Sequence, residues 1–592
     1  MGFKDFLAFA EKQKVFQESK LKKPPKIVKK KDEEKKKEEE QVEEGQQAVE
    51  EQEKPTENVE QKDEQKVEEG EEEEKVKEML IFDANSLSSY LYFSVLDSAY
   101  GGQYREYTYR VRHYFQSLQK CGFLISVVFS GSDPAKYSTP AFYTRTLTSL
   151  DASTRQQKFD QLQILPPLVH SVFLQECYYC QVSIHVAAGP AEGVIRALAK
   201  SHPNGLVVSG NHDLMLVTEI PTFVPLSQLR VDNYGVSLKR FSASAFASMV
   251  GVEPKMLYLM GILGATDLVP YYLLFPFHTY LFSQKSDSTK ELIPALAQFL
   301  TKFSTPEEAI KFVLSMSWFT PELTQDPKFS QELFKENITS IFDSYKPTEE
   351  QQHYFDEDYI LFKPLTAPEV EFPSWIIQAY KSGDIHKRYI QAAVTGEMNF
   401  PVIMDAIDHA PATNVSKELR ELCYKLLLQK NDVQITENVR SGTKMVKVTA
   451  TTSKKDVPSL AQIKNLPKSE QIEKLCSIFG SPNSIYEKVY EQYHLPILAL
   501  RYWIKTATPH IAAWEIGVLL LSLSRTTDSK KMKLERPLWL NPRAVSFFAQ
   551  WQSILEASMV LNRVSFFFFF SLVLIFILFY LIFILFIFFF IS

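Results

Sequence analysis

The chain has 592 residues, 45% of them hydrophobic, which is enough for two or three domains with sizeable cores. Its formal charge of −6 is uneven: residues 1–31 carry ten Lys against three acidic residues, and residues 32–78 carry eight Lys against twenty-two. The remainder is almost neutral, which argues against strong nonspecific binding of nucleic acid by the folded body as a whole and leaves room for local basic patches. Five scattered cysteines and a start without a secretory pattern predict an intracellular protein, cytoplasmic or nuclear.

The first 78 residues divide into two segments. Residues 1–19 begin with MGFKDFLAFAEK, whose apolar side chains share one helical face, and this pattern predicts a helix packed on a domain. Residues 20–78 are mainly Lys, Glu and Gln, and such a stretch cannot bury enough apolar surface to offset its ordering entropy. We therefore expect a disordered insertion there. A solvated single helix over part of it is the alternative.

Residues 79–285 show short apolar runs that alternate with helical patterns. This alternation predicts an α/β domain with a parallel sheet and helices on both faces. In such sheets, ligands bind at the carboxyl ends of the strands. The expected strands are MLIFDAN (Met79–Asn85), FLISVVFSG (Phe123–Gly131), VSIHVA (Val182–Ala187) and GLVVSG (Gly205–Gly210). The helix AEGVIRALAK (Ala191–Lys200) is expected before the last of these strands.

The rest of the chain reads as mainly helical. Residues 286–438 and 460–563 contain helical patterns such as PEEAIKFVLSM and LPILALRYWI. The polar, Lys-containing stretch at 439–459 between them predicts a linker.

The final segment, residues 564–592, is almost entirely Phe, Leu, Ile and Val. A helix of some 27 residues would reach roughly 40 Å, more than the roughly 30 Å hydrocarbon core of a bilayer. This length predicts a transmembrane tail anchor, with Arg563 on the cytosolic side. The alternative origin is translated AT-rich noncoding DNA, so a membrane partner is expected only if the tail is genuine.

Four acidic residues follow strands or begin helices where a metal site would form: Asp83, Glu192, Asp213 and Asp267. A metal-dependent phosphodiesterase needs several carboxylates that converge on hard cations, and parallel sheets supply them from strand ends. Each residue also has a purely structural interpretation. The three Asp side chains can cap helices or turns, and Glu192 can complement a helix dipole.

The order of these residues resembles the PIN-like nuclease family that includes the flap endonucleases. Within that family, the asteroid and constitutive-coactivator-of-PPAR-gamma proteins look most similar. The resemblance covers residues 1–12 and 79–270, and extends loosely over the helical remainder. The segments that carry it are MGFKDFLAF, LIFDANSL, GGQY, VVFSG, QILPPLVH, AEGVIRALAK, GLVVSGNHDLML and LYLMGILGATDLVP.

The chain departs from the active pattern of this family at three positions. The resemblance implies carboxylates where the chain has Ser130, Pro190 and Asn211, so that Glu192 and Asp213 stand without their usual partners. The remaining carboxylates could still hold one Mg²⁺ or Mn²⁺ weakly. A well-formed two-metal centre is not expected.

The resemblance implies a nuclease-fold protein with a degenerate metal site that binds nucleic acid, RNA rather than DNA, or serves as a regulatory scaffold for protein partners. The alternative is a Mg²⁺- or Mn²⁺-dependent, structure-specific endonuclease that uses the four acidic residues. Arg145 and Arg155 flank an expected arch where the family contacts nucleic acid. Lys444 and Lys447 belong to a second basic stretch that could bind phosphate, although solvated charge is the simpler interpretation of both regions.

Overall fold

The computed structural model describes the main folded segments of the chain. Apart from isolated positions between 335 and 342, they are residues 9–22 without 14, 77–131 without 97–101, 164–315 without 233–234, 265–270 and 284–290, 372–429 without 401–402 and 407, 432–452, 459–484 without 460, 461, 463 and 464, 494–517, and 542–566. The predicted insertion therefore lies outside the described residues, apart from its two ends. The predicted N-terminal helix is described only for its last turn, which begins at Phe9.

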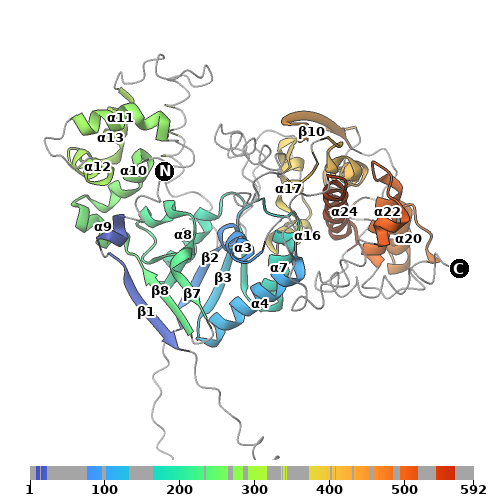
Figure 1. The fold of residues 1–592 in the computed structure, drawn as a ribbon, viewed down its shortest axis with the longest axis horizontal. Helices are drawn as coiled ribbons and strands as arrows, with labels where there is room; N and C mark the ends of the chain where they lie inside the picture. Colours follow the sequence, from blue (N-terminus) through green and yellow to red (C-terminus); the bar gives the residue numbers. More distant parts are fainter. Residues whose placement is uncertain are drawn as a thin grey trace, which may run out of the picture.

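A five-stranded sheet forms the centre of the α/β domain (Figure 1). Its strand order is β4-β3-β2-β5-β6, and every neighbouring pair is parallel. The sequence predicts the first four strands in chain order correctly. Their bounds are β2 (Met79–Asp83), β3 (Leu124–Phe129), β4 (Ser183–Val186), β5 (Gly205–Ser209) and β6 (Phe223–Pro225).

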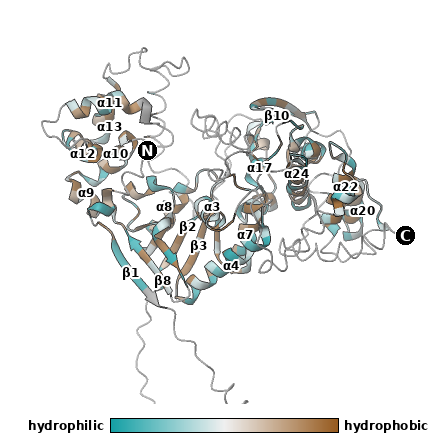
Figure 2. Cartoon of the chain, viewed as in Figure 1, coloured by the Kyte–Doolittle hydropathy of each residue, from teal (hydrophilic) through white to brown (hydrophobic). Residues whose placement is uncertain are grey.

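Alternate residues of the central strand β2 enter two different cores. In β2, Leu80 and Phe82 belong to one hydrophobic cluster, whereas Ile81 belongs to the other. All three side chains are fully buried, and Figure 2 shows β2 and β3 as hydrophobic. Because successive side chains point to opposite faces of a sheet, an unbroken apolar run is what a strand covered on both faces requires.

Helices cover both faces, as the sequence predicts. The first cluster includes residues of α3, α4 and α7, and the second includes residues of α8 and α10. The fold is therefore the α/β, PIN-like arrangement of a parallel sheet between helical layers. The bounds are α3 (Ala84–Phe93), α4 (Tyr104–Lys120), α7 (Val169–Tyr179), α8 (Ala191–Ser201) and α10 (Leu257–Gly264).

A second, smaller sheet has the order β1-β8-β7, and its neighbouring strands are antiparallel. Strand β1 (Gln17–Lys22) pairs with β8 (Gly235–Arg240), and β8 also pairs with β7 (Leu229–Val231). Residues 20–22, assigned from the sequence to the disordered insertion, thus belong to a strand. Beyond this sheet lies a helical group made of α9 (Ala243–Val250), α11 (Tyr271–Ser283), α12 (Leu292–Leu300) and α13 (Pro306–Ser315) (Figure 1).

The C-terminal region is mainly helical, as expected, but it also contains a three-stranded sheet. Strands β10 (Gln434–Ser441) and β11 (Lys444–Thr451) form an antiparallel hairpin, and β9 (Glu397–Asn399) pairs with β10 in parallel. The prediction of a linker at 439–459 is therefore wrong over the length of β11. The helices are α16 (Ser374–Lys381), α17 (Lys387–Thr395), α18 (Lys417–Leu428), α20 (Lys468–Ile478), α22 (His494–Thr506) and α24 (Pro542–Phe566).

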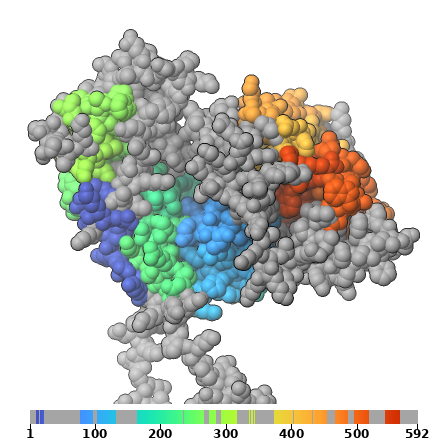
Figure 3. Space-filling model, viewed as in Figure 1, coloured from blue at the N-terminus to red at the C-terminus, as the bar shows by residue number. Residues whose placement is uncertain are grey.

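The C-terminal region packs directly on the α/β domain. One hydrophobic cluster runs without a break from the strands through α4 and α7 to α18, α22 and α24. Tyr104 on α4 donates a hydrogen bond to Gln552 on α24. In Figure 3, α22 and α24 (orange to red) lie on the side of the α/β domain opposite α11–α13 (green).

Helix α24 ends at Phe566, so almost all of the predicted membrane anchor lies outside the described residues. Across the described residues, no single helix combines the length and apolarity needed to cross a bilayer. One sharply bent pair, Ala243–Val250 with Pro254–Gly264, passes that test only when its two helices are taken together.

Candidate functional site

Three neighbouring strands bring polar residues to one edge of the central sheet. Strand β2 ends at Asp83, β5 ends at Ser209, and Ser130 directly follows β3. These strands are adjacent and parallel, so their carboxyl ends meet. Ser209 Oγ donates to Asp83 Oδ2 over 3.0 Å, and Asn85 Nδ2 donates to Ser130 Oγ over 3.0 Å. We call this set the carboxyl edge.

Asp83 accepts hydrogen bonds on both of its carboxylate oxygens. The main-chain N–H of Asn85 donates to Oδ1 over 3.0 Å, which makes Asp83 the N-cap of α3. The hydroxyls of Ser86 and Ser209 both donate to Oδ2. The side chain is only 8% exposed, so these donors replace most of the water that would otherwise solvate its charge.

Glu192 joins the same network through neutral side chains. It lies in the first turn of α8, and its Oε1 accepts from Asn211 Nδ2 over 3.2 Å. The main-chain N–H of Asn211 in turn donates to Ser209 Oγ over 2.9 Å. Ser209 and Asn211 therefore form a bridge of hydrogen bonds between the carboxylates of Asp83 and Glu192.

Asp213 lies next to this bridge, in the first turn of the short 3-10 helix His212–Leu216. Its main-chain N–H donates to Asn211 Oδ1 over 3.1 Å, so that Asn211 caps the helix. Three of the four predicted metal ligands are thus linked to Asn211 by hydrogen bonds. Glu192 and Asp213 bond to Asn211 directly, and Asp83 is linked to it through Ser209. The fourth, Asp267, lies outside the described residues, shortly after the end of α10 at Gly264.

The predicted nucleic-acid contacts are not part of the described carboxyl edge. Arg145 and Arg155 lie outside the described residues. Lys444 and Lys447 lie on β11, which belongs to the separate three-stranded sheet. The ammonium of Lys447 pairs with the carboxylate of Glu397 over 3.2 Å at the surface.

A two-metal centre needs several carboxylates around two cations. Hydroxyl and N–H donors instead occupy both oxygens of Asp83 and one oxygen of Glu192. Within the described part of the chain, no group of three or more His, Cys, Asp or Glu residues is placed to hold a metal ion.

No signal in the sequence indicates that α16 and α17 also reach the carboxyl edge. Lys387 Nζ donates to the main-chain oxygen of Ser130 over 3.1 Å, although 257 positions separate the two residues. Tyr380 donates its hydroxyl to the main-chain oxygen of Ala187, directly after β4. The space beside Gly131 is filled by Ala187 and Tyr380, and a Cβ there would lie 2.0 Å from the oxygen of Ala187.

No protein-family model matches the chain. Two curated proteins are similar to the chain in sequence. "Single-strand DNA endonuclease ASTE1" of Mus musculus is 22% identical over 546 residues, which is 82% of this chain and 79% of that protein. The protein of the same name from Danio rerio is 20% identical over 528 residues, 82% of this chain and 74% of that protein.

Solved structures of DNA-bound nucleases are also similar in part. The catalytic core of Rad2 in complex with DNA substrate is 11% identical, with a TM-score of 0.26 over 48% of this chain and 80% of that chain. Human GEN1 in complex with Holliday junction DNA is 13% identical, with a TM-score of 0.27 over 54% of this chain and 71% of that chain. Scores this low add nothing to the fold assignment, which rests on the sheet described above. Over about four fifths of its length the chain is therefore similar in sequence to two proteins of the asteroid kind, and its central sheet is the parallel α/β sheet that its motifs predict.

Proposed function

We propose that this protein binds single-stranded nucleic acid at the carboxyl edge and does not cleave it efficiently, so that it acts as a regulatory scaffold. Two observations support nucleic acid as the ligand. The two curated relatives are named as single-strand DNA endonucleases, and the polar residues gather where parallel α/β sheets bind ligands.

The contact between Ser209 and Asp83 carries the second part of the proposal. In a metal-dependent nuclease, cations neutralise the charge of the strand-end carboxylates and activate water. Here the donors to Asp83 are hydroxyl and main-chain N–H groups, which stabilise the carboxylate without a cation. In addition, Ser130 and Asn211 are neutral residues at positions where the family resemblance implies carboxylates, so fewer anionic groups are available to bind a cation.

A binding and cleavage assay on the full chain tests this proposal, with mild detergent to keep the apolar C-terminus in solution. Labelled single-stranded DNA, single-stranded RNA, flap and hairpin substrates are incubated in Mn²⁺ and, separately, in EDTA. We expect the protein to bind a single-stranded substrate both in Mn²⁺ and in EDTA. We expect no cleavage product in Mn²⁺. The RNA and DNA arms decide between RNA, which the coactivator resemblance favours, and the DNA named for the relatives.

The control is the double variant Asp83→Ala, Asp213→Ala. Product that forms in Mn²⁺ and disappears in this variant overturns the proposed lack of cleavage. Absence of retention for every substrate overturns nucleic-acid binding itself.

The second candidate is a Mg²⁺- or Mn²⁺-dependent endonuclease with one ion at Asp83, Glu192, Asp213 and Asp267. The name of the two relatives is the observation that favours it. It requires an ion to displace the serine and asparagine donors that now surround the carboxylates. The Mn²⁺ arm of the assay distinguishes it from the first candidate.

A further inference from the structure

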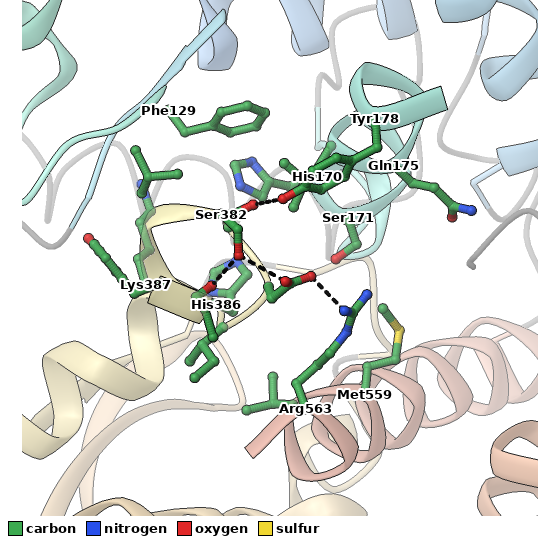
Figure 4. Close-up of a pocket in the computed structure, with 18 of the residues that line it drawn as sticks. Phe129, His170, Ser171, Gln175, Tyr178, Ser382, His386, Lys387, Met559 and Arg563 are labelled. Carbon is green, nitrogen blue, oxygen red and sulfur yellow. Dashed lines mark hydrogen bonds and ion pairs between the residues drawn. The ribbon is translucent and has the colours of Figure 1, made fainter. Parts of the chain in front are cut away.

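A cavity of about 940 Å³ lies between the α/β domain and the C-terminal helices. Its walls come from the end of β3, from α7, from the segment that joins α16 to α17, and from α24 (Figure 4). The volume lies within the range of roughly 300–1,000 Å³ that is typical of small-ligand sites. None of the predicted site residues that the structure describes lines it.

The cavity adjoins the carboxyl edge, because Ser130 belongs to both. Ser130 lines the cavity, and its hydroxyl accepts the hydrogen bond from Asn85. Lys387 also lines the cavity and donates to the main-chain oxygen of Ser130 over 3.1 Å. A strand lying on the carboxyl edge would therefore pass the mouth of the cavity next to a fixed ammonium group.

The walls of the cavity combine rings with aliphatic side chains. Phe129, Tyr178 and Trp375 supply rings, and Leu174 and Met559 supply aliphatic surface. Tyr178 is 46% exposed, although its hydroxyl donates to the main-chain oxygen of Ser382 and so fixes the ring (Figure 4). Rings fixed beside a concave surface are what an unpaired base stacks on, whatever its sequence.

Two histidines at the cavity are neutral at physiological pH. Burial and the nearby charges of Lys387 and Arg388 lower the pKa of His170 to about 3. The same causes hold the pKa of His386 well below its usual value. Nδ1 of His386 accepts from the main-chain N–H of Arg388 over 3.3 Å, which places the ring proton on Nε2. A neutral imidazole offers one donor and one acceptor, which suits the edge of a base better than a bare phosphate.

The charges around the cavity are largely balanced. Arg563 pairs with Asp384 over 2.6 Å, and Arg388 pairs with Glu556 over 2.7 Å. Lys387 adds a cation at the end next to Ser130. The two ion pairs favour a mostly neutral ligand.

We propose that this cavity is a nucleotide pocket that takes one unpaired nucleotide of a single strand bound at the carboxyl edge. The base lies against the rings and the neutral histidines. The inference rests on the proposed function, since the strand must first bind at the edge.

The test uses the full chain in EDTA, so that cleavage does not enter, and measures the affinity of a labelled single-stranded oligonucleotide. Trp375→Ala removes a ring from the wall, and Ala379→Trp fills the cavity from α16. We expect each change to weaken binding roughly tenfold, the effect of losing one stacked base. Trp514→Ala is the matched control, because Trp514 is 70% exposed and does not line the cavity, and its affinity should equal that of the wild type.

A second arm changes the ligand and is independent of protein folding. Oligonucleotides with a single abasic site are compared on the wild-type chain, and the nucleotide pocket predicts that one position is more sensitive than its neighbours. Sensitivity at that position should vanish in Ala379→Trp. Binding that is tight but indifferent to the abasic position and to both cavity variants overturns the pocket and leaves the proposed function standing. Failure of every oligonucleotide to bind overturns the proposed function as well.

Discussion

Ser209 and Asp83 are 126 positions apart in the chain, yet the hydroxyl of the first donates to the carboxylate of the second over 3.0 Å. Ser209 is completely buried, and its oxygen also accepts from the main-chain N–H of Asn211. One hydroxyl therefore holds the ends of β2 and β5 in register with the loop that carries Asp213.

Ser209→Ala removes this hydroxyl from both partners. Hydrogen bonds to charged groups contribute about 1.5–3 kcal/mol, so we expect the free energy of unfolding to fall by that amount. Urea denaturation followed by circular dichroism measures the change. Ser248→Ala, at an exposed position on α9, is the control and should change stability by less than about 0.5 kcal/mol. Equal effects of the two changes would contradict the bridging role of Ser209.

Asn211→Asp replaces the amide that donates to Glu192 with a second carboxylate at the same place. Two carboxylates at hydrogen-bonding distance repel each other, so the variant should melt at a lower temperature than the wild type in EDTA. They also offer oxygen ligands to a divalent ion, so Mn²⁺ should raise the melting temperature of the variant more than that of the wild type. Thermal melts with and without Mn²⁺ measure both shifts. The exposed Asn414→Asp serves as control, and a Mn²⁺ effect of the same size there would refute the prediction.

Arg420 and Glu437 form a buried ion pair in the C-terminal region, with N–O distances of 2.9 and 2.8 Å and side chains that are 3% and 2% exposed. Arg420→Met leaves the carboxylate buried without its partner and should destabilise the protein by about 3–5 kcal/mol. The double variant Arg420→Met, Glu437→Leu should recover a large part of that loss, because neither charge remains. Lys447→Ala breaks a surface pair instead and should cost less than about 1 kcal/mol. Chemical denaturation of the four proteins checks this order.

Stability should also depend on pH through His170. Its pKa is about 3 in the folded chain and about 6.5 when unfolded, so the unfolded chain binds the additional proton at intermediate pH. The stabilisation is therefore complete above pH 6.5 and is lost as the pH falls below it. Between pH 7 and pH 5 the loss from one such histidine is about 2 kcal/mol. Denaturation at several pH values should show a shallower slope for His170→Gln than for the wild type, and identical slopes would contradict this account.

The central sheet was predictable because its signal is local. Leu80, Ile81 and Phe82 are consecutive and all buried, and a short apolar run that ends at turn-forming residues is typical of a strand covered on both faces. The carboxyl edge could be located because polar residues such as Asp83 and Asn211 stand at the ends of predicted strands. The hydrogen bonds that fill this edge could not be predicted, because nothing in the sequence distinguishes Ser209 from any other serine after a strand.

The hairpin of β10 and β11 was missed for a different reason. Its inward face includes Glu437 between Ile435 and Val439, so the alternation of apolar and polar residues looks broken. The structure resolves the contradiction, since Arg420 neutralises Glu437 and allows a charged residue to occupy a buried strand position. Gly442, with φ at +56°, was the local turn signal. The contact of Lys387 with Ser130 had no local signal at all.

Strand β1 pairs with β8, and Gln17 and Arg240 are the most widely separated strand partners among the described residues. A ribosome adds roughly 5–20 residues per second, so the first strand waits about 10–40 s for its partner to be synthesised. Contacts of such long range also slow folding in general. The emerging polypeptide consequently exposes an unpaired first strand until residue 240 of the 592 has been added, and the small sheet can close only after that point.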